Sequence, residues 1–307
     1  MLFEGLFIPY VTPFNEQGAL DEASLVRLAE FFAAIPGVAG LVSCARIGEG
    51  PVLTLEEKQQ VYRTVGEVAR RNGKQHIATI APQSTDEAID IVRDLETLAV
   101  DAAMIFPPLL LAWGRVEGEL KFRFWEDIGR STSLPLVLFQ IPVRSYWYDV
   151  STIGRISQLD SVVAMKEASF DEDLYTRTVQ ELVRLGNQLT ILSGNDKFVG
   201  RSYELGGRGA LIGISNLATA AWAELDRAGR SGDIQTALAI QTELSELSEL
   251  VFAEPIVEAV SRIKLILRHQ GLIDTARVRR PQLGVSAAEA KVLLSSYEVL
   301  CQKRKVA

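Results

Sequence analysis

The sequence predicts an α/β protein built as a (β/α)8 TIM barrel with a C-terminal helical domain. Short apolar runs recur at even intervals, longer amphipathic segments separate them, and this pattern stops near residue 217. The runs are continuous rather than alternating, which is typical of parallel strands buried on both faces. Eight strand and helix units within about 220 residues fit a closed barrel better than an open doubly wound sheet.

The expected strands are the apolar runs at residues 6–11, 38–43, 76–81, 102–106, 134–140, 162–166, 190–193 and 209–214. The expected barrel helices include residues 21–34, 55–71, 85–98, 117–131, 171–185 and 197–205. Capping side chains mark several helix starts: Asp21, Thr54, and Ser84 with Glu87 three residues later, the spacing of a capping box. The loops that leave the strands therefore end at these residues.

No further strand pattern follows, and the remaining segments predict helices at residues 222–230, 233–251, 254–271 and 286–301. We expect two domains, a barrel in residues 1–220 and a helical domain in residues 221–307. Because no flexible linker or low-complexity segment separates them, the helical domain is expected to pack on the barrel.

Composition narrows the class of protein. A chain of 307 residues with 48% hydrophobic and 23% charged residues predicts a soluble globular protein. The net charge of −7 provides no basic field for nucleic acid or an anionic membrane. No apolar stretch approaches the roughly 20 residues of a membrane span, and signal-peptide features are missing, so we expect a cytoplasmic protein. Two cysteines and two histidines without ligand spacing predict neither disulfides nor a metal site.

Lys166 is the candidate catalytic residue. It closes the apolar run at residues 162–166, and it is the only lysine among the expected strand ends. Burial would lower the pKa of its amine and free it to attack a carbonyl, whereas a lysine that only marks a strand end would keep its charge in solvent. With no adjacent catalytic histidine or metal cluster, imine formation is favoured over hydrolysis.

Several motifs in order along the chain resemble the dihydrodipicolinate synthase / N-acetylneuraminate lyase family of Schiff-base-forming aldolases. The matching segments are residues 5–14, Ile47-Gly48-Glu49, Met165-Lys166-Glu167-Ala168-Ser169, Ser193-Gly194-Asn195-Asp196 and Gly206-Gly207-Arg208-Gly209. The resemblance implies an imine at Lys166 with pyruvate or another 2-oxo acid, no cofactor, and a homo-oligomer, a dimer or a tetramer built from dimers.

The same comparison exposes departures from the family pattern. Arg46 and Ile47 stand where the family places two hydroxyl residues, Phe139 stands for the fifth-strand tyrosine, and Leu109 stands for a second tyrosine. Loss of a positioned acid–base group costs roughly 10²–10⁴-fold in rate. The departures therefore predict a divergent lyase that is not an authentic dihydrodipicolinate synthase. The alternative is a family member with impaired turnover that serves as a binding or regulatory protein.

The expected substrate-binding residues are Arg46, Ile47, Phe139, Arg144 and Leu211. Arg46 could bind the substrate carboxylate bidentately, or pair with Glu49 or another local carboxylate. Arg144, at the position of the family's carboxylate-binding arginine, could do the same or form a structural salt bridge. Tyr10, or a water held by Ser43, Gln140 or Ser215, could replace the missing proton relay, although a packed Tyr10 is the favoured interpretation.

Overall fold

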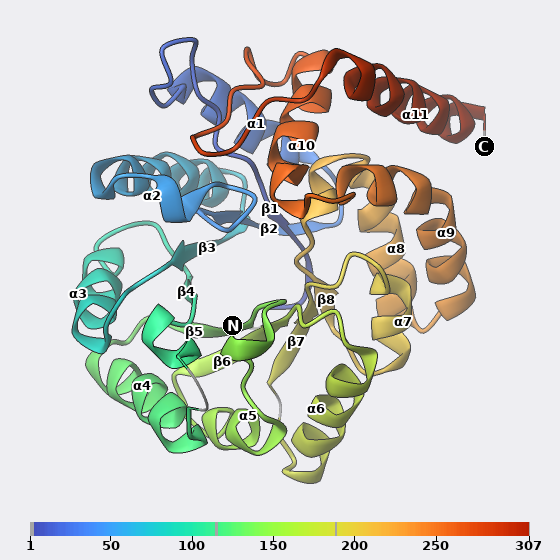
Figure 1. The fold of residues 1–307 in the computed structure, drawn as a ribbon. Coiled ribbons are helices and arrows are strands. Elements are labelled where there is room, and N and C mark those ends of the chain that lie inside the picture. Colours follow the sequence, from blue (N-terminus) through green and yellow to red (C-terminus); the bar gives the residue numbers. More distant parts are fainter. Residues whose placement is uncertain (1–2, 114–115, 188, 307) are drawn as a thin grey trace.

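A closed barrel of eight parallel strands forms the centre of the molecule, as the sequence predicts (Figure 1). The computed structural model describes residues 3–113, 116–187 and 189–306. The strands run in chain order around the barrel: β1 (Gly5–Pro9), β2 (Val38–Ser43), β3 (Gln75–Ile80), β4 (Ala102–Ile105), β5 (Leu136–Gln140), β6 (Val162–Glu167), β7 (Thr190–Ser193) and β8 (Gly209–Ala210).

In the part of the chain that the structure describes, eight helices surround the strands (Figure 1). They are α1 (Glu22–Ala34), α2 (Leu55–Arg71), α3 (Thr85–Leu95), α4 (Gly118–Ser131), α5 (Val150–Ile156), α6 (Glu172–Arg184), α7 (Val199–Glu204) and α8 (Thr219–Ser231). Short 3-10 turns lie in the loops: η1 (Gly50–Val52), η2 (Leu109–Ala112), η3 (Arg144–Tyr146) and η4 (Gly213–Asn216).

Three of the helix starts carry the caps that the sequence predicts. The side chains of Asp21, Thr54 and Ser84 each accept a hydrogen bond from the backbone N–H three residues later. The reciprocal capping box forms at Thr54, where the Glu57 carboxylate returns to the cap backbone. At Ser84 the box is incomplete, because the Glu87 carboxylate accepts from the backbone N–H of Gln83 instead.

The eighth strand differs from its expected range of residues 209–214. Only Gly209 and Ala210 pair with the neighbouring strands, and the chain then turns into η4. The apolar run is buried as expected, but part of it packs against helices rather than in the sheet.

The C-terminal helices are α9 (Ile234–Val251), α10 (Ala259–His269) and α11 (Ala287–Val306), with the short turn η5 (Ile256–Glu258) before α10. Orange to red in Figure 1, they lie together on the side of the barrel next to α1 and α8. The domain boundary expected at residue 220 stays a prediction; α8 begins at Thr219 and packs against β1 and β8.

Two layers of side chains form most of the core. Inside the barrel, residues such as Phe7, Val42, Met104 and Leu192 form one cluster. A larger cluster fills the space between the strands and the surrounding helices. Within the described ranges, no helix is long and apolar enough to cross a membrane, and no group of three or more His, Cys, Asp or Glu side chains could hold a metal ion.

Candidate active site

Lys166 lies on the inner face of β6, at the end of the barrel formed by the C-terminal ends of the strands. Its side chain is 8% exposed, and its Nζ lies 4.4 Å from the centroid of the Phe139 ring on β5. Burial lowers the pKa of Lys166 to about 7; nearby Asp196 opposes this shift and the Arg46 charge adds to it. A large fraction of the amine is therefore neutral near pH 7, as a nucleophile requires.

A glycine lets the loop after β7 pack directly on this lysine. A Cβ atom added at Gly194 would lie 2.9 Å from Cε of Lys166 and 2.6 Å from Cβ of Ala168. The Gly194 N–H also donates to the backbone oxygen of Glu167 at 2.6 Å, which holds the loop in place. A larger residue at position 194 would displace the reactive side chain.

Asp196 is a buried carboxyl group whose charge acts on this lysine. It follows β7 by three residues and is 8% exposed. Its Oδ1 accepts a hydrogen bond from the backbone N–H of Ile214 at 3.0 Å. Burial raises the pKa of Asp196 to about 6, despite the opposing effects of that hydrogen bond and of the Lys166 and Arg46 charges. The carboxyl group therefore has both protonation states available near neutral pH.

Arg46, in the loop after β2, is half-buried at the mouth of the barrel. Its Nη2 donates to the backbone oxygen of Ile256 at 3.2 Å. Burial lowers the pKa of Arg46, and Asp196 opposes that shift. The alternative pairing of Arg46 with Glu49 does not occur, because Glu49 pairs with Lys264 instead.

The Glu49–Lys264 pair anchors the loop that carries Arg46. Both side chains are fully buried, although they lie 215 residues apart in the sequence. The Glu49 carboxylate also accepts from the backbone N–H of Arg279 at 2.7 Å and from Gln282 at 3.2 Å. Cys44 and Glu49 both adopt positive φ angles, 55° and 56°, so the loop bends sharply at each end. The C-terminal region thus holds the loop in a strained shape.

Three other expected substrate-binding residues are divided between the inner and the outer cluster of the core. Phe139 and Leu211 lie in the cluster inside the barrel, and the Phe139 ring centroid is 4.9 Å from that of Phe106. Ile47 packs in the outer cluster, close to Gly213 and Phe252. Their roles as substrate contacts stay predictions.

Arg144 lies in η3, with a side chain that is 83% exposed. Its Nη2 is 3.9 Å from Oδ2 of Asp171, and its guanidinium lies 5.1 Å from the Trp147 ring centroid. An exposed pair at this distance contributes little to stability. The salt bridge considered as the alternative role of Arg144 is therefore present but long. The guanidinium stays accessible to an anion.

Of the four groups considered as replacements for the proton relay, three are hydrogen-bonded elsewhere and the fourth, Tyr10, is packed outside the barrel interior. Tyr10 packs in the outer cluster, and its hydroxyl has no hydrogen-bond partner within the described residues. Ser43 Oγ lies 2.7 Å from Nε2 of His76, and Ser215 Oγ donates to the Ile212 carbonyl at 2.6 Å. The Gln140 amide exchanges two hydrogen bonds of 3.0 Å with the backbone of Tyr148. A packed Tyr10, the favoured interpretation, is confirmed.

Sequence reasoning missed the roles of two residues. Asp196 stands within a quoted motif at a strand end, and a carboxylate there signals contact with the site. Lys264 gives no such signal, because nothing near it in the sequence identifies a partner in a loop of the barrel.

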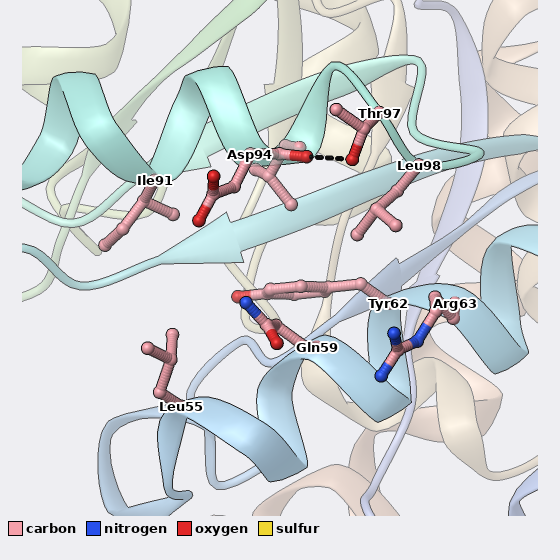
Figure 2. Close-up of a pocket in the computed structure, with 9 residues that line it drawn as sticks. Leu55, Gln59, Tyr62, Arg63, Ile91, Asp94, Thr97 and Leu98 are labelled. Atoms are coloured by element: carbon pink, nitrogen blue, oxygen red, sulfur yellow. Dashed lines mark hydrogen bonds between the residues drawn. The ribbon is translucent and has the colours of Figure 1, made fainter.

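A hollow of about 190 Å³ lies outside the barrel between α2 and α3 (Figure 2). In it, the Thr97 hydroxyl donates to the backbone oxygen of Asp94 at 2.7 Å, and the Tyr62 hydroxyl donates to the carbonyl of Thr79 at 2.7 Å. The residues that line it come from α2, from α3 and from the turn after α3: Leu55, Gln59, Tyr62, Arg63, Ile91, Asp94, Leu95, Thr97 and Leu98. None comes from the strand ends around Lys166, so this hollow is separate from the candidate active site.

The structure is a parallel barrel with one buried lysine of lowered pKa among its strand ends. Such a site allows an amine to attack a carbonyl, so the fold and the site together define a class of proteins that can form imines. Residues 2–297 match the family model described as the dihydrodipicolinate synthetase family, and the chain belongs to this family. The resemblance predicted from the motifs is confirmed.

Sequence relatives support this assignment. The 4-hydroxy-tetrahydrodipicolinate synthase of Anaeromyxobacter sp. (strain K) is 34% identical over 293 residues, which cover 94% of this chain and 95% of the relative. The enzyme of the same name from Thermodesulfovibrio yellowstonii is 32% identical and covers 82% and 84% of the two chains. Because such relatives carry this name, the comparisons do not support the expectation that the chain is not an authentic dihydrodipicolinate synthase.

Solved structures share the fold over nearly the whole chain. The dihydrodipicolinate synthase of Thermotoga maritima has a TM-score of 0.89 at 24% identity, with 98% of this chain and 99% of that chain covered. The chloride-inhibited dihydrodipicolinate synthase of Acinetobacter baumannii, complexed with pyruvate, has a TM-score of 0.87 at 25% identity, with 97% and 98% covered.

Proposed function

We propose that this protein is a class I lyase or aldolase in which Lys166 forms an imine with pyruvate or another 2-oxo acid. The observation that carries the proposal is the buried Lys166 amine, whose pKa of about 7 makes it nucleophilic at neutral pH. The names of the relatives and the pyruvate in the Acinetobacter baumannii structure support a 2-oxo acid as the substrate.

The chemistry begins with attack of the neutral amine on C2 of the oxo acid. Loss of water from the carbinolamine gives a protonated imine, which withdraws electrons from the adjacent carbon. The resulting enamine can add to an aldehyde, and the reverse path cleaves a carbon–carbon bond. No cofactor enters this scheme, because the imine itself is the electron sink.

Arg46 is the residue that we assign to the substrate carboxylate. Its guanidinium is held at the mouth of the barrel by the Ile256 carbonyl, and its charge acts on the Lys166 amine. A bidentate pair would bring C2 of the oxo acid toward Nζ. Arg144 is more exposed and is the second candidate. Loss of pyruvate affinity in Arg46→Ala, with affinity kept in Arg144→Ala, supports the assignment; the reverse pattern contradicts it.

The second substrate is assigned only as a carbonyl compound. 4-Hydroxy-tetrahydrodipicolinate synthesis is the first reaction to assay, because relatives carry that name. The ring of Phe139 lies where the sequence resemblance expects a tyrosine hydroxyl, which favours a changed route for protons over the family's usual one.

Borohydride trapping tests the proposal. Pyruvate and borohydride together should add one reduced adduct to the intact protein, and Lys166→Met should remove it. Failure of every 2-oxo acid to give an adduct would instead support the alternative, a binding or regulatory protein that has kept the fold.

We also propose that the protein is a homo-oligomer in the cytoplasm. The side chains of Leu109, Leu110 and Trp113 are exposed together around η2, which favours a contact with a second copy. Light scattering should give a mass above that of one chain for the wild type and a lower mass for Leu110→Glu. A monomeric wild-type protein contradicts this proposal.

A further inference from the structure

Asp196 is buried and held in a fixed orientation, and it follows by two residues Gly194, the glycine that packs on the Lys166 side chain. The hydrogen bond from Ile214 N–H to Oδ1 holds the carboxyl group in place. Within the described part of the chain, no other side-chain hydrogen bond to Asp196 is formed, and Oδ2 is not among the buried atoms that lack a partner. The second oxygen therefore keeps some exposed surface.

Buried carboxylates usually have an ion-pair partner, and Asp196 does not. Among the described residues it forms no salt bridge, although the charges of Lys166 and Arg46 lie close enough to lower its pKa. Because the amine and the carboxyl group form no direct pair, both stay available to a bound substrate. A purely structural aspartate would gain more from a direct pair.

The other polar groups near the lysine offer no equivalent. Ser43, Gln140 and Ser215 have partners elsewhere, and Tyr10 packs in the outer cluster. Thr79 has an unpaired hydroxyl and pairs in register with Met104 of the inner cluster, so it faces the barrel interior. A threonine hydroxyl does not ionise near neutral pH, whereas a carboxyl group does.

We propose that Asp196 is the acid–base group that moves protons during imine and enamine formation, in place of the missing hydroxyl relay. This assignment rests on the proposed function. In the first step, the protonated carboxyl group of Asp196 gives its proton to the carbinolamine hydroxyl. The C–O bond breaks, water leaves, and the products are the protonated imine and the Asp196 carboxylate.

In the second step, the carboxylate takes a proton from C3 of the imine. The electron pair of the C–H bond forms the C2–C3 double bond, and the electrons of the C=N bond return to the nitrogen. A neutral enamine and a protonated Asp196 result, so the residue is ready to return the proton when the reaction reverses. Atoms and charges balance without another reactant.

Exchange of the methyl protons of pyruvate tests this second step directly. The protein is incubated with pyruvate in D₂O, loss of the methyl signal is followed by NMR, and imine formation is measured separately by borohydride trapping after long incubation. Asp196→Asn keeps an oxygen for the Ile214 N–H but removes the titratable group. Glu167→Gln is the matched control, because Glu167 is also a buried carboxyl group but is bound by Asn195 and Ser169 on the other side of β6.

We expect Asp196→Asn to trap pyruvate to the wild-type extent and to exchange its methyl protons at least about 10²-fold more slowly. Asp196→Glu should recover part of the exchange rate, and Glu167→Gln should stay within about threefold of wild type. Exchange by Asp196→Asn at the wild-type rate would overturn the assignment, as would complete loss of trapping, which would make Asp196 a support for Lys166 instead. An absence of trapping in the wild-type protein would remove the proposed function, and this assignment with it.

Discussion

Breaking the buried pair between Glu49 and Lys264 by removing one partner should destabilise the protein more than breaking any of its surface pairs. Removing one partner leaves the other as an uncompensated buried charge, which typically costs about 3–5 kcal/mol. In Glu49→Gln, the Lys264 ammonium would keep only the Arg277 carbonyl at 2.8 Å and the Phe14 ring at 4.2 Å. Burial already lowers the pKa of Lys264 to about 8 even with its partner present.

Thermal unfolding measures this loss of stability. For a chain of 307 residues, about 2 °C of Tm corresponds to 1 kcal/mol, so Glu49→Gln and Lys264→Met should each lower Tm by about 6–10 °C. The double variant should lose less than the sum, with a coupling of about 2 kcal/mol, because it leaves neither charge alone. Arg123→Gln, which breaks an exposed pair with Glu119, is the control and should leave Tm unchanged.

Two outcomes would contradict a stabilising role for this pair. If either single variant unfolds within about 2 °C of the wild type, the interior around the pair tolerates an unpaired charge. If the losses in the double variant simply add, the two groups act independently, and the loop that carries Arg46 is held by other contacts.

The lowered pKa of Lys166 gives a pH prediction. The neutral amine attacks the carbonyl, so under conditions in which this attack limits the rate, the initial rate of trapping should rise tenfold per pH unit below a midpoint of about 7 and level off above it. Arg46→Gln should move the midpoint up, because the Arg46 charge lowers this pKa, and Asp196→Asn should move it down. Equal midpoints would contradict both couplings. Gly194→Ala should slow trapping at least about tenfold by displacing Lys166, whereas Gly284→Ala, which has open space around it, should not; an unchanged rate in Gly194→Ala would show that the loop relaxes.

Much of the barrel follows from local patterns. The strands at Val38–Ser43 and Thr190–Ser193 match their expected ranges because each is a continuous apolar run between polar segments. The run that includes β8 has the same composition but only two residues in the sheet, since burial alone does not distinguish a strand from a packed turn. The seven-residue α5 was not among the expected helices, although Asp149 caps it.

The reactive residue of the site was predictable from the sequence, whereas the residues that surround it were less so. Lys166 could be recognised from its place at a strand end, and the family motifs pointed to the same residue. The residues that surround Lys166 could not be predicted from the local sequence. The contact of Arg46 with Ile256 and the pairing of Glu49 with Lys264 join segments more than 200 residues apart, and only the folded chain brings them together.

A crystal structure of the protein after reduction with pyruvate and borohydride would show directly whether Lys166 forms the imine. We expect a covalent bond from Nζ of Lys166 to C2 of the former oxo acid. We also expect the carboxylate of the adduct within hydrogen-bond distance of Arg46 and the Asp196 carboxyl group facing C3. Unmodified Lys166 at saturating pyruvate, or an adduct on any other lysine, would contradict this expectation.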